Sequence, residues 1–379
     1  MLIILMLACI IVGLMTTHTY RRKSDMPTAA GSILMVGGIF IQGAWGELTG
    51  LSVYSYATSA LVILLIAIWI YLLLGYITSI RKDEFYAIHL ADPVGRFAIG
   101  TWIAGTSILL ITIYTSFPSS WVYETVLILA VMTIGLWIFF MYWVVKSMID
   151  IAKMQAGRHV HGIVLLATVA TQSIAMLLYD IFGHSEAMLI ICRLLIGWGL
   201  VLYVVLASLM IYRYVRYAWN TADQSQSNNV MMYGALAITG VAVIETSSWT
   251  PSSVSILWWI SLAVLLVVEC IEMIRAVMRI RRHGWKTAVG TYDVTQWSRI
   301  FTIGIFNLFT WRLISMNSSS IMNASLANLQ MSVVIITAGM MVILLIWQCV
   351  LSVDAFVHRP VVAEVPVQRI PHVHSRKMK

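Results

Sequence analysis

The chain has 379 residues, of which 60% are hydrophobic and 11% charged, and its mean hydropathy is +0.88. These values lie far from those of soluble globular proteins and predict a polytopic membrane protein with no sizeable soluble domain. The formal net charge of +8 is explained by basic residues beside the spans and by attraction to the anionic headgroups of a lipid bilayer, so it gives no indication of nucleic-acid binding.

Eleven apolar windows bounded by charge predict an all-α fold of eleven membrane-spanning helices. In chain order they lie near residues 1–17, 29–46, 59–80, 96–114, 122–146, 162–182, 187–212, 230–247, 255–274, 298–315 and 332–351. The first window has no basic residue ahead of it and no small-residue cleavage pattern after it. We interpret it as a retained anchor helix, and a removed signal sequence is the alternative.

Lys and Arg collect in alternate links, which sets the expected orientation because flanking basic residues are held on the cytoplasmic side. The links on one face, "ELTGLSVYSYAT", "TSFPSSW", "GHSE", "SSWTPSS" and "SMNSSSIMNASLANLQ", contain no Lys or Arg. We therefore expect the N-terminus outside a plasma membrane and the C-terminus in the cytoplasm. The expected organisation is an anchor helix with a basic linker over 1–25, a ten-helix domain over 26–352, and a disordered basic tail over 353–379.

After the anchor, every second span carries most of the membrane glycines together with Ser, Thr, Gln or Asn, whereas the spans between them are nearly all aliphatic and aromatic. The glycine-bearing spans begin near 29, 96, 162, 230 and 298, about every 65 to 68 residues, which indicates a helical hairpin used five times. This pattern predicts five inner helices around a central pore inside a ring of five lipid-facing helices. Glycines that only form packing seams between helices are the alternative.

Three segments resemble the tellurite-resistance and C4-dicarboxylate transporter family, which includes the slow-type anion channels of plant guard cells. "DMPTAAGSILMVGGIFIQGAWGEL" resembles the first pore helix of that family, and "VHGIVLLATVATQSIAMLLYDIFG" its fifth helix. "YDVTQWSRIFTIGIFNLFTWRL" is similar to the ninth helix, which holds the family's gate. The resemblance covers roughly residues 26 to 352 in the order and spacing of the spans.

The resemblance implies a homotrimer of ten-helix protomers, each with a pore that passes small anions and is closed by a phenylalanine. Matching Trp297, Ser298 and Phe301 to the ninth-helix pattern places that gate at Phe301. An apolar ring across a narrow pore resists hydrated ions by dewetting, and its rotation opens the path; an aromatic that merely packs between helices is the alternative. Further expected pore-lining positions are Gly38, Gly100, Thr168, Gly240, Gly304 and Asn307.

Some features depart from the family pattern. The mid-helix prolines that are common in the family's pore helices are replaced by glycine or threonine, and glycine permits a bend without forcing one. Thr302 follows Phe301 where the family has Gly or Pro. The leading eleventh helix is also outside the usual plan.

Charges at the ends of the inner helices differ between the two faces. The expected cytoplasmic mouth carries Arg96, His161 and Arg299, and the expected outer mouth carries Glu47, Asp180 and Glu245, with Arg312 as the exception. A basic mouth concentrates anions and an acidic one repels them, which favours anions gathered from the cytoplasm. Two alternatives remain: basic residues that only fix topology, and an acidic outer mouth that marks a cation or proton route.

Two charged residues lie unusually deep in the spans. Arg193 is unfavourable in lipid unless it is paired, so we expect a structural ion pair there. Glu269 continues into a charged face at helical spacing, which indicates an intracellular helix extension with ion pairs. The expected partners of Arg193 are Asp180, Glu186 or Glu124.

The sequence offers no enzyme constellation, no phosphate-cradling loop, no metal site and no cofactor motif. We therefore expect transport of small anions such as chloride, nitrate, malate or oxyanions. The alternatives are a proton-coupled exporter of C4-dicarboxylates or oxyanions and, more distantly, a non-conducting membrane receptor or scaffold.

Overall fold

The computed structural model describes residues 26–50, 55–153, 159–183, 185–216, 227–317 and 324–358. The expected anchor helix and nearly all of the expected basic tail lie outside the described residues. Those that are described form helices and links, with no strand among them. The α-helices are α2 (Ser32–Gln42), α3 (Ala44–Thr49), α4 (Tyr56–Arg81), α5 (Gly100–Ser116), α6 (Ser120–Lys153), α7 (Leu166–Phe182), α8 (Glu186–Arg216), α9 (Met231–Glu245), α10 (Pro251–Ala288), α11 (Thr295–Asn317) and α12 (Ala324–His358).

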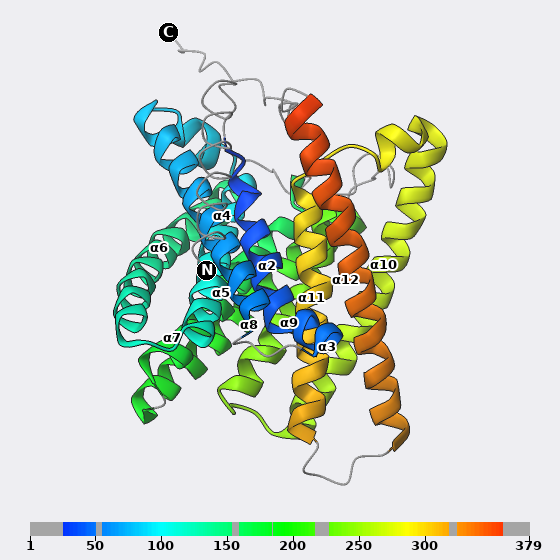
Figure 1. The fold of residues 1–379 in the computed structure, drawn as a ribbon. Coiled ribbons are helices and arrows are strands. Elements are labelled where there is room, and N and C mark those ends of the chain that lie inside the picture. Colours follow the sequence, from blue (N-terminus) through cyan, green and yellow to red (C-terminus); the bar gives the residue numbers. More distant parts are fainter. Residues whose placement is uncertain are drawn as a thin grey trace.

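These helices form the five predicted hairpins, because α2 and α3 together make the first inner span, interrupted at Gly43. A short 3₁₀ turn precedes each of α2, α5, α7 and α9, so the inner helices begin alike. Each is then followed by a longer helix that returns across the molecule (Figure 1). The ten-helix, all-α membrane fold expected from the sequence is confirmed.

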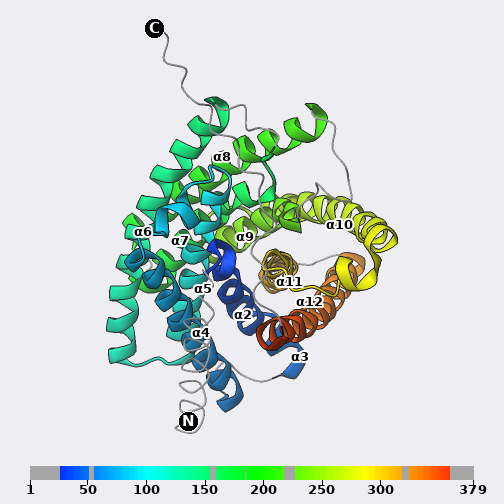
Figure 2. The same cartoon turned by 90° about the horizontal axis from the view of Figure 1, so that it is seen from above.

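The five inner helices, α2, α5, α7, α9 and α11, form a closed ring. Each contacts the next along the chain, and α11 contacts α2, which closes the circle. Figure 2 looks along this ring and shows α11 nearly end-on, surrounded by α2, α9, α10 and α12. The closed ring gives the molecule a defined central axis.

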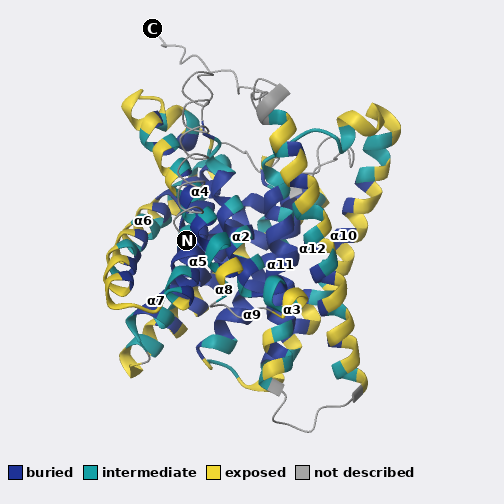
Figure 3. Cartoon of the chain, in the orientation of Figure 1, coloured by how far each residue is buried: buried dark blue, intermediate teal, exposed yellow. Residues whose placement is uncertain are grey.

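The outer helices, α4, α6, α8, α10 and α12, cover the ring. Each of the first four packs against two neighbouring inner helices, and α12 packs against α11 and α3. The burial pattern follows this arrangement: 94% of the apolar window of the α7 span is buried, against 28% in α6, and exposed residues lie on the periphery (Figure 3). Large exposed hydrophobic side chains on the outer helices suit contact with lipid tails.

Seven of the described helices are long and apolar enough to cross a membrane by length and composition, and α9 and α11 are not among them. Both lie within the ring and contact outer helices. A helix that is covered by protein does not have to be apolar all round, so polar residues are tolerated there. This explains why α9 and α11 are weaker candidates for spans than the outer helices.

Glycines of the inner helices lie in the seams of the ring. A Cβ at Gly100 would come within 2.8 Å of the carbonyl oxygen of Leu166 in α7, and one at Gly240 within 2.3 Å of the ring of Phe309 in α11. Gly38 and Gly304 likewise face neighbouring helices, α5 in one case and α12 with α2 in the other. Each inner helix is packed between two other inner helices and is also covered by outer helices. This crowding gives a packing reason for glycine in every second span.

Candidate functional site

The orientation of α11 can be read from its contacts with the four helices that surround it. Toward α9, the Thr302 hydroxyl donates to the Tyr233 hydroxyl at 3.0 Å, and the Phe309 ring packs on Gly240. These contacts fix one flank of α11 against its neighbour in the ring. The polar bond lies in the N-terminal half of α11 and the aromatic contact in its C-terminal half.

The back of α11 faces α10 and α12, away from the axis. Trp258 Nε1 of α10 donates to Thr310 Oγ1 at 2.9 Å, and the Trp258 ring stacks near Phe306 with centroids 6.4 Å apart. Toward α12, Asn307 Nδ2 donates to the Val334 carbonyl oxygen at 2.9 Å. Asn307 was expected to line the pore, but its amide is used to hold α12 against the ring.

The second ring neighbour, α2, lies on the opposite flank of α11 from α9. A Cβ at Gly304 would meet Ile39 of α2 at 3.1 Å, and a Cβ at Gly43 would lie 3.6 Å from the Cβ of Leu308. Since α9 and α2 are the two ring neighbours of α11, the interior of the ring lies between these flanks.

Phe301 occupies the face of α11 that remains. Successive residues of an α-helix turn about 100° around its axis, so Leu308 and Arg312 lie about 20° and Ile305 about 40° from Phe301, on one stripe. Thr302 and Phe309 lie about 100° and 80° to one side, and Gly304 about 60° to the other. Phe301, Ile305 and Leu308 are fully buried, and Leu308 borders the α2 flank. The stripe therefore faces the centre of the ring, with apolar side chains at mid-height and a basic residue toward the C-terminal end of α11.

Three of the four expected outer-mouth residues come together at the C-terminal ends of α7, α9 and α11. Arg312 Nη2 lies 3.9 Å from Glu245 Oε1, and Asp180 is close enough to act on Glu245 electrostatically. The Arg312 side chain remains 45% exposed. The fourth residue, Glu47, is separate: it lies on α3 and faces α11 and α12. This end of the ring thus carries both signs of charge.

Arg96, expected at the cytoplasmic mouth, is turned toward the outer helix α6. Its Nη1 lies 2.7 Å from Asp150, its Nε donates to the Leu90 carbonyl oxygen at 2.6 Å, and its guanidinium lies 4.9 Å from the ring centroid of Trp143. The side chain is buried and its charge is compensated. The contacts indicate that Arg96 anchors α6 to the ring rather than facing the axis.

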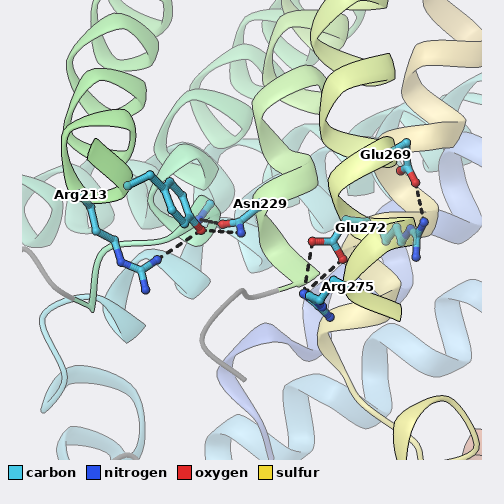
Figure 4. A network of polar contacts seen from close by, with 8 residues as sticks. Arg213, Asn229, Glu269, Glu272 and Arg275 are labelled. Carbon is cyan, nitrogen blue, oxygen red and sulfur yellow. Dashed lines mark hydrogen bonds and ion pairs between the residues drawn. The ribbon is translucent and has the colours of Figure 1, made fainter. Parts of the chain in front are cut away.

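Arg299 also points away from the axis, about 160° around α11 from Phe301. Its guanidinium forms an ion pair with Glu269 of α10, and the Tyr233 hydroxyl donates to the same carboxylate at 2.9 Å. Farther along α10, Arg275 and Glu272 form a buried pair at 3.2 Å (Figure 4). The pairing within α10 agrees with the charged face expected there. The partner of Arg299 lies 30 residues away in another hairpin and left no signal in the sequence.

His161 begins the turn before α7. Its Nδ1 accepts a hydrogen bond from the Ile163 N–H at 3.5 Å. Burial, together with the nearby charge of Arg213 and with His159, lowers the pKa of His161 to about 3. The imidazole is neutral near pH 7, so it adds no positive charge to this end of the ring. Beside it, Asn229 and Tyr214 tie α8 to the start of α9 (Figure 4).

Thr168 lies on the outward side of α7. One turn later, Thr171 accepts a hydrogen bond from Trp137 of α6 at 3.2 Å, and Gln172 donates to the Ile196 carbonyl oxygen of α8 at 3.3 Å. At helical spacing Thr168 falls between these two directions. It therefore faces the groove between two outer helices, which differs from its expected place in a pore lining.

Arg193 was expected in a structural ion pair, but it is exposed on α8. Its neighbour Cys192 points inward, with Sγ 3.4 Å from the Ala175 carbonyl oxygen, so the next residue points outward. The ion pairs formed by the described residues do not include Arg193, and Glu124 and Glu186 are exposed elsewhere. The expected ion pair of Arg193 is therefore not formed within the described part of the chain.

Among the described residues, no group of three or more His, Cys, Asp or Glu side chains is placed to hold a metal ion. No curated protein matches the chain. A family model described as voltage-dependent anion channel matches residues 25–354, which is most of the chain and the same stretch as the five hairpins. Anion transport across membranes is the activity of that family. The chain is therefore a multi-pass membrane protein that belongs to the voltage-dependent anion channel family.

Proposed function

We propose that this protein conducts small anions along the axis of the inner ring and that Phe301 is the gate. One observation carries the proposal: the contacts of α11 with α2, α9, α10 and α12 leave Phe301 and Ile305 as the buried face toward the axis. Apolar side chains across a narrow path exclude hydrated ions by dewetting. The described conformation corresponds to a closed pore.

The neighbours of Phe301 support a gate that moves as a side chain. Thr302 is bonded to Tyr233 of α9, and Arg299 is paired with Glu269 of α10. These bonds hold the backbone on both sides of Phe301, so opening by rotation of the ring requires less rearrangement than moving the helix. Arg312, on the same stripe, is the positive charge that an anion would meet at the outer end.

The experiment is anion flux from liposomes that contain the purified protein, with nitrate, chloride and malate in parallel. Phe301→Ala is compared with Phe306→Ala, the matched control: Phe306 is equally buried and five residues away on the same helix, but it stacks against Trp258 of α10. We expect a sharp rise of flux in Phe301→Ala alone. An equal rise in both variants would mean that α11 was merely loosened.

The permeant anion separates the remaining transport candidates. Acidic residues at the outer end, Asp180 and Glu245, favour as a second candidate a proton-coupled exporter of C4-dicarboxylates such as malate, or of oxyanions. A steep dependence of malate flux on an imposed pH gradient supports that reading, and flux that is indifferent to the gradient supports the channel. No flux from any folded variant would favour the receptor or scaffold.

We further propose that the protein forms a homotrimer in the plasma membrane, with its N-terminus outside and its C-terminal tail in the cytoplasm. The family resemblance supports the trimer, and the Lys and Arg bias of the links supports the orientation. The three-part organisation over 1–25, 26–352 and 353–379 belongs to the same proposal. Native mass measurement and labelling of cysteines placed near each terminus test these points.

A further inference from the structure

A polar cluster lies at the outer end of the bundle, apart from the ring axis. Glu47 of α3 faces α11 and α12, where it lines a cavity of about 130 Å³ together with Trp311, Val334 and Ala338. Asn307 of α11 lies beside it: its Oδ1 would be 3.5 Å from a Cβ at Gly43, one turn before Glu47. Asn307 is fully buried. The cluster joins the end of the first hairpin to the last one.

This cluster contains more buried hydrogen-bond acceptors than donors. Both amide protons of Asn307 are already donated, to the Val334 carbonyl oxygen at 2.9 Å and to Thr337 Oγ1 at 3.1 Å. Asn307 Oδ1 and both carboxyl oxygens of Glu47 are buried, and no donor among the described residues reaches them. A buried acceptor without a donor is unfavourable. A proton on Glu47 corrects this, because a protonated carboxyl group has one O–H donor and an ionised one has none.

The charges around Glu47 also favour the neutral form. Arg312 is the nearest cation on α11, and it pairs with Glu245 at the axis. The other Asp, Glu, Lys, Arg and His residues of α2, α4, α11 and α12 are Arg81, Arg299, Asp354 and His358, all at the opposite ends of their helices. Tyr56 begins α4 at the same end as Glu47 and is exposed, and the remaining titratable side chains, Tyr71, Tyr76 and Cys349, lie farther along α4 and α12. The links 51–54 and 318–323 contain no Asp, Glu, Lys, Arg or His. Among the described residues, no cation is therefore paired with Glu47 to favour its ionised form.

We propose that Glu47 and Asn307 form a proton-binding site that sets the charge at the outer end of the inner ring. With the proton bound, Glu47 is neutral and supplies the missing donor to Asn307 Oδ1 or to a water in the adjoining cavity. When the proton leaves, a carboxylate without a cation appears at this end of the ring, and its field opposes anions that approach the axis. The expected consequence is that anion flux falls as the external pH rises through neutrality. This consequence, unlike the proton site itself, rests on the proposed function.

The first test does not depend on transport. Infrared difference spectra of the protein in liposomes are recorded from about two pH units below neutrality to about two above it. We expect part of the carbonyl band of protonated carboxyl groups to disappear within this range of pH. That part is expected to be absent in Glu47→Gln and present in Glu124→Gln, which removes an exposed carboxylate of α6.

Identical spectra for wild type and Glu47→Gln would overturn the proton site. So would a band that is lost at constant pH when sodium or ammonium is added, because the site would then bind a cation. If Glu47→Gln misfolds, Glu47→Asp serves in its place. It keeps a titratable carboxyl group, so its carbonyl band should remain but at a shifted position. In the flux assay, Phe301→Ala should lose nitrate flux above neutrality, and Phe301→Ala/Glu47→Gln should not. A titrating band without any flux would leave the proton site standing and refute the proposed function.

Discussion

The ion pair between Glu269 and Arg299 offers a quantitative test of how α11 is held. Glu269→Leu removes the carboxylate that compensates Arg299 and that accepts from Tyr233. Breaking a buried pair by removing one partner is unfavourable by about 3–5 kcal/mol. The side chains retain 20% and 11% exposure, so we expect the low end, about 3 kcal/mol.

The double variant Glu269→Leu/Arg299→Leu separates an unpaired charge from lost packing. With both charges gone, only the acceptor for Tyr233 is missing, at about 1 kcal/mol. The double variant should therefore be more stable than Glu269→Leu by about 2 kcal/mol, although it contains one more substitution. Unfolding titrations in mixed micelles measure the four corners of this cycle, with the exposed Glu124→Leu as control. Additive losses would refute the reasoning, because they would show that the two side chains do not depend on each other.

Three further outcomes follow from the geometry. Gly240→Val should destabilise the protein by about 2 kcal/mol through the clash with Phe309, whereas Gly135→Val, with nothing within 4 Å, should not. Equal effects of the two substitutions in an unfolding assay would show that Gly240 does not lie in a tight seam between helices. A protonated Glu47 supplies a donor to acceptors that are buried in the folded state, so the folded state should bind this proton more tightly than the unfolded state. Wild-type stability should therefore fall relative to Glu47→Gln as pH rises through neutrality, and level off above it; parallel pH profiles of the two proteins would refute this. Arg312→Gln should lower nitrate flux in a Phe301→Ala background while unfolding stability changes little, since its pair with Glu245 is long and partly exposed; unchanged flux would remove Arg312 from the anion path.

The architecture could be predicted from composition and period because a bilayer constrains them strongly. Spans must be apolar over a fixed length, basic residues collect on one side, and helices packed among helices carry small and polar residues. The recurrence of glycine-bearing spans therefore indicated five hairpins and the division into inner and outer helices. The order of the spans also carried the resemblance to the family.

The roles of single side chains depended on the rotation of each helix against its neighbours, which the sequence does not contain. Arg299, Asn307 and Thr168 lie on inner helices, as expected, yet they face α10, α12 and the groove between α6 and α8. Rotation is set by packing contacts such as Phe309 on Gly240, between residues 69 positions apart. The sequence by itself determined which helices surround the axis. Only the tertiary structure decided which faces they turn toward it, because that choice depends on contacts between hairpins far apart in the chain.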